Sequence, residues 1–219
     1  MLPPIQKIKG IIFDLDGTIA DTLPLCIKAF RNAIGPLINR PVSDEEIIAT
    51  FGPSEEGTIM ALAPKHYEKG VADYLHFYKE FHGMCSEPFE GIKESLAFLQ
   101  EAGVAIAMVT GKGQYSTHIS LEQFGLTKYF NLLETGWPQG PRKAAGIGSI
   151  LQQWKHLNKG EVVYVGDAPA DIDASKQAGI AVIAAAWAPA TDAGKLKPLH
   201  PDELFYTVAD FKKWILDKI

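Results

Sequence analysis

The chain has 219 residues, of which 47% are hydrophobic and 21% charged, and its formal net charge at pH 7 is −5. This length allows one large domain, or a core domain with a smaller second one, and the composition is that of an ordinary globular protein. The negative charge, with no run of more than two adjacent lysines or arginines, argues against a nucleic-acid-binding surface. Cys26 and Cys85 are too few for a disulfide framework.

Other common classes are also disfavoured. The chain has no apolar run of about 18 residues or more, so we expect no membrane span. The start, Met1-Leu2-Pro3-Pro4, lacks the features of a signal peptide, and we expect a cytoplasmic protein without membrane or nucleic-acid partners. The six histidines form no His-Glu-x-x-His zinc motif, and we interpret them as surface or packing residues.

The first predicted element is a short strand that runs into an acidic loop. Residues 10–13 are continuously apolar, which is typical of a buried strand in a parallel sheet. The loop that follows, Asp14-Leu15-Asp16-Gly17-Thr18, holds two carboxylates spaced i, i+2, a glycine for a sharp turn and a hydroxyl. Open α/β sheets bind ligands at the carboxyl ends of their strands, so this loop is a candidate active site.

Residues 23–87 are predicted to be helical and without strands. Breaks are expected at Gly35-Pro36, Gly52-Pro53, Ala63-Pro64 and Gly83. Ser43 with Glu46 forms a capping-box signature at the start of one helix. We interpret the segment as a helical insertion that packs over the acidic loop.

From Pro88 onward, helices and strands are predicted to alternate. Strands are expected at residues 104–109, near 130–133, at 162–165 and at 181–187, with a loop-rich stretch at 189–201 and a last helix around Phe211. Such alternation predicts an α/β fold in which a parallel sheet has helices on both faces.

Polar groups are predicted at the ends of three strands. They are Asp14 and Asp16, then Thr110, then Asp167 with Asp171 four residues later, while Lys143 begins an intervening helix. If Pro169 is the first helical residue, Asp167 and Asp171 can both reach the same site.

This set of groups suits phosphoryl transfer. Asp14 could attack phosphorus, and Asp16 could protonate the leaving oxygen and later activate water. Magnesium suits Asp14, Asp167 and the Asp16 carbonyl as ligands. Lys143 and Thr110 would hold the phosphoryl oxygens.

In combination, the motifs resemble the haloacid dehalogenase superfamily, in particular its phosphoglycolate phosphatase-like and β-phosphoglucomutase-like members. The matching motifs follow in order: Asp14-Leu15-Asp16-Gly17-Thr18, Val109-Thr110-Gly111, Lys143, and Gly166-Asp167 with Asp171. The resemblance implies a Rossmann-like three-layer core, residues 1–22 and 88–219, with a small helical cap domain, residues 23–87, inserted after the first strand.

The resemblance also implies roles for individual residues. The nucleophile would be Asp14 and the acid/base Asp16, with Lys143 as the third catalytic group. Magnesium would be bound by Asp14, Asp16 and Asp167, with Asp171 supporting. Phosphate would be bound by Thr18, Thr110, Gly111 and Lys143. The expected activity is Mg²⁺-dependent hydrolysis of small phosphate monoesters, such as phosphoglycolate, through an aspartyl-phosphate. The partner is then a small phosphorylated metabolite, and the protein is a monomer or weak homodimer.

Several reactions stay open within the superfamily. Dehalogenases lack an acid two residues after the nucleophile, so Asp16 favours phosphoryl transfer. A phosphonoacetaldehyde hydrolase would need a cap lysine such as Lys28, which we interpret as a solvated charge. A phosphohexose mutase and a pyrophosphatase use the same core. A non-catalytic binding relative should lack one of the four acids, and all are present.

Two positions depart from the usual pattern. Lys143 is followed by Ala144 where the family usually has proline, and Arg142 could share or take the role of Lys143. Ala168 replaces the usual hydroxyl residue after Asp167, which removes a possible hydrogen bond. Substrate choice is expected in the insertion. Candidates are Arg31, which could pair with a substrate carboxylate or lie on the surface, and the turn Phe51-Gly52-Pro53-Ser54, which could equally be a plain connection.

Overall fold

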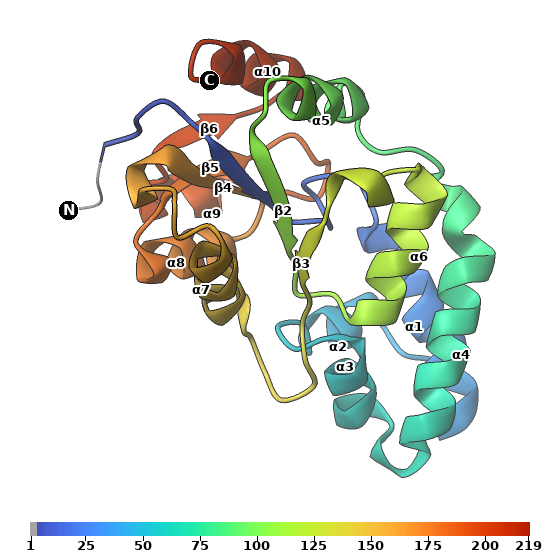
Figure 1. The fold of residues 1–219 in the computed structure, drawn as a ribbon. Coiled ribbons are helices and arrows are strands. Elements are labelled where there is room, and N and C mark those ends of the chain that lie inside the picture. The colour runs from blue at the N-terminus through green and yellow to red at the C-terminus, as the bar shows by residue number, and fades with distance from the viewer. Residues whose placement is uncertain (1–3) are drawn as a thin grey trace.

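The computed structural model describes residues 4–219 and contains a six-stranded, fully parallel sheet (Figure 1). The order of the strands is β3-β2-β1-β4-β5-β6. Their bounds are β1 Gly10–Phe13, β2 Ala105–Val109, β3 Leu132–Glu134, β4 Val162–Gly166, β5 Ala181–Ala185 and β6 Glu203–Phe205. The prediction of an α/β fold with a parallel sheet is therefore confirmed. The order reverses between β1 and β4, so the loops after these two strands open into the crevice where such sheets bind ligands.

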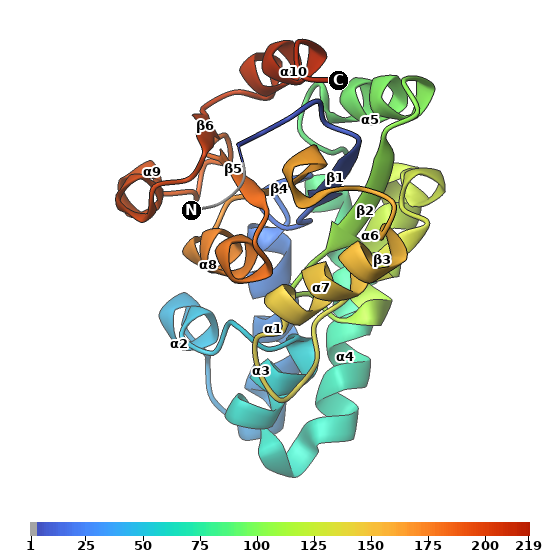
Figure 2. The same cartoon turned by 60° about the vertical axis from the view of Figure 1, so that its left-hand side comes forward.

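The central strands are buried because the sheet is covered on both faces (Figure 2). One face carries α5 (Ile92–Glu101), α6 (Gln114–Phe124) and α10 (Val208–Leu216). The other carries α7 (Lys143–Gln153), α8 (Pro169–Ala178) and the short α9 (Ala193–Leu196). Alternate residues of one strand face different layers: Phe13 packs in the first core cluster and Ile12 in the second. This double burial explains why the strands are continuous apolar runs.

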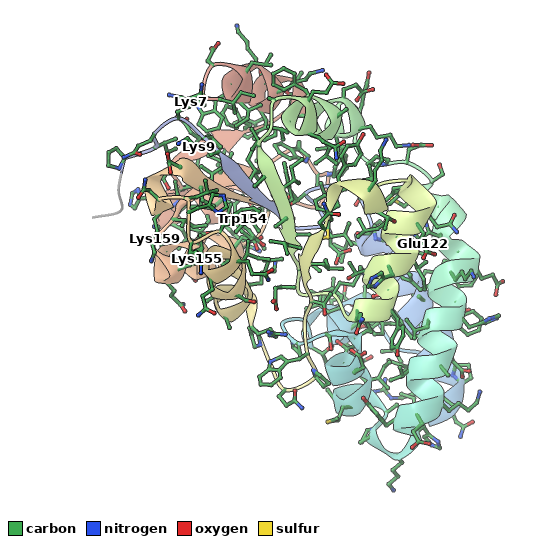
Figure 3. The ribbon with its side chains drawn as sticks, viewed as in Figure 1. Lys7, Lys9, Glu122, Trp154, Lys155 and Lys159 are labelled. Carbon is green, nitrogen blue, oxygen red and sulfur yellow. The ribbon has the colours of Figure 1, made fainter. Side chains whose placement is uncertain are left out.

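The end of α7 illustrates how tightly the second layer packs. Trp154 is buried against the sheet, where a Cβ built on Gly10 would lie 2.9 Å from the indole ring. Lys155 and Lys159, nearby in the sequence, are exposed (Figure 3). The glycine at the start of β1 therefore makes room for the indole.

Between β1 and α5 the chain forms helices only. They are α1 (Leu23–Ile38), α2 (Asp44–Ile48), α3 (Glu55–Leu62) and α4 (Tyr67–Glu80), with 3-10 turns at Pro64–His66 and Phe81–Cys85. These helices, called the helical insertion below, lie together beyond the carboxyl ends of the strands (Figure 1). The aromatic stripe of α4 forms its interior: Tyr74 and Tyr78 are fully buried, and Tyr74 stacks on Phe30 of α1.

Most predicted element boundaries agree with the structure to within two residues. The capping box at Ser43 is present, and Pro169 is the first residue of α8, as expected. The break predicted at Gly35-Pro36 is wrong: α1 continues through Pro36 to Ile38, because a proline in the last turn removes only one hydrogen bond.

The region after residue 188 also differs from the prediction. The stretch predicted to be loop-rich contains α9 and a 3-10 turn at Lys197–Leu199, and β6 was not predicted. β6 is a three-residue edge strand of half-buried residues, too short to leave a periodic signal. Among residues 4–219, no helix is long and apolar enough to span a membrane.

Candidate active site

Asp14 is the first residue after β1, and its two carboxylate oxygens have different surroundings. Oδ2 accepts a hydrogen bond from Lys143 Nζ at 2.6 Å, whereas Oδ1 is buried and has no hydrogen-bond partner. Lys143 reaches this position because it is the first residue of α7, with its ammonium also 2.5 Å from Asp171 Oδ1. Burial opposes its charge, but Asp14 and Asp171 together outweigh that penalty and raise the pKa of Lys143. The site therefore presents one held and one free oxygen on the same buried carboxylate.

Three carboxylates meet at the switch point of the sheet. Oxygen atoms of Asp14, Asp167 and Asp171 all lie within 4.8 Å of one another. Burial raises the pKa of Asp14 to about 6, against the attraction of Lys143. Burial, with repulsion from Asp171 and Asp14, raises the pKa of Asp167 to about 8. One ammonium does not neutralise three clustered acids, so this set of carboxylate oxygens fits a hard divalent cation such as Mg²⁺.

Asp171 is occupied by protein partners. Its carboxylate meets Lys143 and the Tyr164 hydroxyl, at 2.5 and 3.0 Å from Oδ1, and accepts from the Ala168 amide at 2.9 Å through Oδ2. The last contact is a capping interaction at the start of α8. These bonds are compatible with the prediction that Asp171 supports the metal site. They hold Lys143 and the loop between β4 and α8 in place.

Asp167 is held by contacts that the sequence did not indicate. Thr191, in the loop after β5, donates its hydroxyl to Asp167 Oδ2 at 2.9 Å. Gly17 approaches from the acidic loop with φ +75°, and a Cβ built there would lie 2.2 Å from the same oxygen. Thr191 thus provides, from a distant part of the chain, a hydroxyl of the kind that Ala168 cannot supply.

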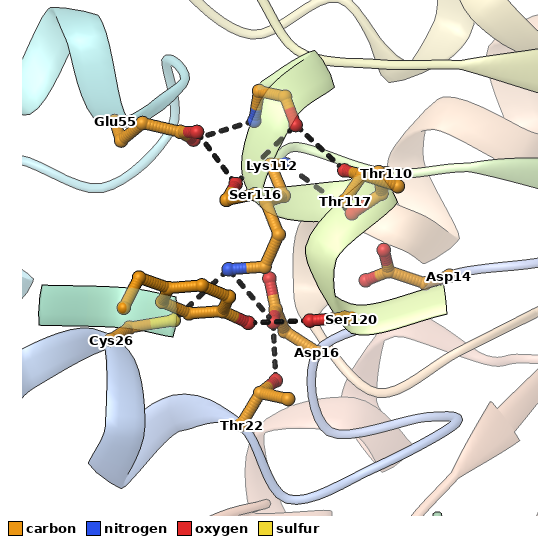
Figure 4. Close-up of polar contacts among 12 residues, drawn as sticks. Asp14, Asp16, Thr22, Cys26, Glu55, Thr110, Lys112, Ser116, Thr117 and Ser120 are labelled. Carbon is orange, nitrogen blue, oxygen red and sulfur yellow. Dashed lines mark hydrogen bonds and ion pairs between the residues drawn. The ribbon is translucent and has the colours of Figure 1, made fainter. Parts of the chain in front are cut away.

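Asp16 is not part of the cluster formed by the other three acids, and its carboxylate contacts Thr22 and Lys112 instead (Figure 4). Its Oδ1 accepts from the Thr22 hydroxyl and lies 3.3 Å from Lys112 Nζ. Its side chain is 32% exposed, in contrast to 5% for Asp14. The carboxylate of Asp16 is therefore held at one oxygen, Oδ1, and is partly open to solvent.

The predicted phosphate-binding residues other than Lys143 lie in the loops that follow β1 and β2. Thr18 is fully buried, and its hydroxyl has no hydrogen-bond partner. Thr110 is buried at the end of β2, and Gly111 lies beside the stem of Lys143, with an ideal Cβ 3.8 Å from Cε. Arg142, the alternative to Lys143, instead pairs with Glu134 at 3.1 Å. Of these two adjacent cations, Lys143 is the one that contacts Asp14.

The model of the family described as haloacid dehalogenase-like hydrolase matches residues 11–185. The chain belongs to this family. A relative from Caldanaerobacter subterraneus subsp. tengcongensis, assigned as the pyrophosphatase PpaX, is 31% identical over 184 residues, which are 83% of each chain. The tyrosine-protein kinase PtkA of Mycobacterium tuberculosis H37Rv is 29% identical over 188 residues, 84% of this chain and 64% of that protein.

Solved structures show the same fold. A predicted phosphoglycolate phosphatase from Haemophilus somnus 129PT superposes with a TM-score of 0.75 at 23% identity, covering 95% of this chain and 98% of that one. The family match and this likeness confirm the predictions of a haloacid dehalogenase-like hydrolase with a Rossmann-like core.

In this family member, the helical insertion contacts the core beside the acidic loop. Glu55, the first residue of α3, accepts from the Gly113 amide and the Ser116 hydroxyl, each at 2.6 Å, at the start of α6 (Figure 4). Burial raises the pKa of Glu55. The amide of Ser54 donates to the carbonyl of Trp137 at 3.0 Å. The turn 51–54 therefore lies against the loop that leads to Lys143.

Two candidate residues of the insertion have other partners. Arg31 pairs with Asp44 of α2, and both side chains are 47% exposed. The ammonium of Lys28 lies 4.3 Å from the centre of the Phe81 ring. These contacts suit a surface role for Arg31 and a packing role for Lys28.

Sequence reasoning missed three residues that contact the aspartates of the site, Thr22, Lys112 and Thr191. It also missed Glu55, which joins the helical insertion to the start of α6. A signal existed only for Lys112, because it follows Thr110-Gly111 directly. For the other three, isolated polar residues in loops or at a helix start carry no pattern that separates them from solvated groups.

Proposed function

We propose that this protein is a Mg²⁺-dependent phosphatase of small phosphate monoesters, acting through an aspartyl-phosphate on Asp14. The observation that carries the proposal is the asymmetry of Asp14: Lys143 holds Oδ2, and Oδ1 is buried without a partner. A nucleophilic carboxylate needs one free oxygen in a fixed direction. The raised pKa of Asp14, about 6, is compatible with an ionised nucleophile at neutral pH.

The reaction consists of two displacements at phosphorus. Asp14 Oδ1 attacks and the bond from phosphorus to the ester oxygen breaks, while Asp16 gives that oxygen its proton. Water then attacks the aspartyl-phosphate, Asp16 takes a proton from the water, and cleavage of the acyl phosphate bond restores Asp14. Lys143 and the unpaired Thr18 hydroxyl bind phosphoryl oxygens throughout. The cation would be held by Asp14, Asp167 and the Asp16 carbonyl, and it would supply positive charge that offsets the charge of the phosphoryl group.

The helical insertion would act as a cap domain, residues 23–87, over a core formed by residues 1–22 and 88–219. The contacts of Ser54 and Glu55 with core loops support this division. We propose a cytoplasmic location and a monomer or weak homodimer, as expected from the sequence.

The substrate is the open question within this function. A phosphoglycolate-like ester is our first candidate. Pyrophosphate is the second, because the relative at 31% identity is assigned as a pyrophosphatase. In pyrophosphate the leaving group is itself a phosphate, and Asp14, Asp16 and Lys143 would act in the same roles.

The test is phosphate release from a panel containing phosphoglycolate, pyrophosphate, sugar phosphates and 4-nitrophenyl phosphate, with and without Mg²⁺. We expect turnover that needs Mg²⁺ and falls by more than about 1,000-fold in Asp14→Asn. The matched control is Asp173→Asn, an exposed aspartate of α8, which should retain wild-type rates. Equal activity of Asp14→Asn and wild type would refute the mechanism, and conversion of β-glucose 1-phosphate without phosphate release would indicate a mutase.

A further inference from the structure

Lys112 carries a buried positive charge that the reaction above does not use. It follows Thr110-Gly111 after β2, and its side chain is only 3% exposed. Its ammonium lies 3.3 Å from Asp16 Oδ1, 3.1 Å from Cys26 Sγ and 4.4 Å from the centre of the Tyr78 ring. An ammonium has three N–H groups, and these three neighbours can occupy all of them. The Lys112 ammonium therefore has protein partners for all three of its N–H groups.

The position of this ammonium is fixed from two sides. Its backbone carbonyl accepts from the Gly136 amide at 2.8 Å, and its amide contacts Thr110 Oγ1 at 3.3 Å, so the core holds the main chain. Cys26 of α1 and the ring of Tyr78 of α4 enclose the other end of the side chain from the helical insertion. Lys112 thus spans from the core into the insertion, with Asp16 as its carboxylate partner.

Asp16 differs from Lys112 in its access to solvent. The Asp16 side chain is 32% exposed, about ten times more than that of Lys112. Thr22 and Lys112 both approach the same oxygen, Oδ1, which leaves Oδ2 for a reacting group. A ligand can thus reach Asp16 in this arrangement. Lys112 is buried, so it can influence a bound ligand only through Asp16.

We propose that Lys112 is a positioning residue for Asp16. It holds Oδ1 so that Oδ2 faces the oxygen of the leaving group. The proposal rests on the proposed function, in which Asp16 donates the proton to that oxygen. A buried lysine is costly unless its charge is needed, and a methionine of similar length would fill the same space without that cost. The geometry therefore points to Asp16 as the reason for the charge.

The proposal predicts a dependence on the leaving group that a packing role would not produce. A basic alkoxide needs a proton to depart, whereas an acidic nitrophenol departs without one. If Lys112 orients the acid, its loss should slow esters of basic alcohols selectively. If Lys112 only supports packing, all esters should be slowed alike.

The experiment compares kcat/KM for 4-nitrophenyl, phenyl and benzyl phosphate, three esters of similar size with increasingly basic leaving groups. Lys112→Met should reduce kcat/KM for benzyl phosphate about 10- to 100-fold more than for 4-nitrophenyl phosphate. In an Asp16→Asn background, the same substitution should not change the ratio between the two esters further. Equal loss on all three esters, or the same selective loss without Asp16, would overturn the proposal.

Lys128→Met is the matched control. Lys128 also lies over a tyrosine ring, 4.9 Å from the centre of Tyr129, but it is exposed. Its replacement should leave all three rates unchanged.

Cys26→Ala provides a second test in case the Lys112 variant does not fold. It removes one partner of the Lys112 ammonium but keeps the charge of the lysine. It should shift the ratio of esters in the same direction by about threefold, and an unchanged ratio would count against the proposal.

Failure of this proposal can be separated from failure of the proposed function. If the wild type hydrolyses the esters and Lys112→Met shows no selectivity, only the positioning role is wrong. If the wild type hydrolyses none of them, the phosphatase assignment fails for these esters. A crystal structure of Lys112→Met then decides the positioning role: a turned Asp16 carboxylate supports it, and an unmoved Asp16 overturns it.

Discussion

Lys143 donates to one oxygen of Asp14, at 2.6 Å, and leaves the other oxygen of the same carboxylate without a partner. These residues are 129 positions apart in the chain. They meet because Asp14 directly follows the central strand β1 and Lys143 begins α7, on the helix layer next to the switch point. Lys143 therefore holds the Asp14 carboxylate in place and places a positive charge between Asp14 and Asp171.

The first prediction concerns this pair. Lys143→Met should lower kcat about 100- to 1,000-fold, because it removes a buried charge beside the phosphoryl group. It should also destabilise the metal-free protein by about 3–5 kcal/mol at pH 8, where Asp14 and Asp171 lose their partner. The loss should be smaller at pH 5, because Asp14, whose pKa is raised to about 6, can then bind a proton. Urea unfolding at the two pH values measures this, with the exposed Lys155→Met as control.

The second prediction concerns pH and the pKa of Asp167. Its pKa is raised to about 8 in the folded protein, whereas an unfolded aspartate titrates near about 3.9. The folded state therefore binds the proton more tightly, and stability is lost as the pH rises between these values. In EDTA, the wild type should lose roughly 1–3 kcal/mol of stability from pH 5 to pH 8, after allowance for partial exposure.

Asp167→Asn has no carboxylate to ionise, so its melting temperature in EDTA should fall less over the same pH range. Added Mg²⁺ should raise the melting temperature of the wild type at pH 8 and that of Asp167→Asn much less. The same pH dependence in both proteins would show that Asp167 is not the responsible group.

The third prediction tests the contact between Gly17 and Asp167. Both Gly17 and Gly103 have φ +75°, but a Cβ on Gly17 would lie 2.2 Å from Asp167 Oδ2, and one on Gly103 would meet nothing within 4 Å. Each change to alanine should cost about 1–2 kcal/mol for the left-handed backbone. Only Gly17→Ala should also lower kcat/KM, by about 100-fold, because it displaces Asp167. Comparable activity in the two variants would contradict the assigned contact.

The fourth prediction concerns the attachment of the helical insertion. Glu55→Gln should weaken the bonds to the Gly113 amide and the Ser116 hydroxyl, since it removes a negative charge from the start of α6. Hydrogen exchange at the first turn of α6 should accelerate, corresponding to about 1–2 kcal/mol. Glu122→Gln, an exposed glutamate of the same helix, provides the control. Unchanged exchange in Glu55→Gln would show that this contact does not hold the insertion.

The sequence by itself determined the fold class and the principal acids of the site. Buried parallel strands require uninterrupted apolar runs, so β1, β2, β4 and β5 were visible as such. The chemistry of Asp14, Asp16 and Asp167 was visible because each follows one of these runs within a few residues. The rule that ligands bind at the carboxyl ends of the strands then predicted one shared site. Asp14 and Asp167 do meet there, whereas Asp16 contacts Thr22 and Lys112.

Only the tertiary structure decided how these groups are held. The choice of Lys143 over Arg142 depends on where α7 begins and on Glu134, which holds the arginine. The contacts of Thr191, Glu55 and Lys112 join segments separated by 24 to 86 residues along the chain. Such contacts follow from the packing of strands and helices, which places distant side chains together without leaving a local pattern in the sequence.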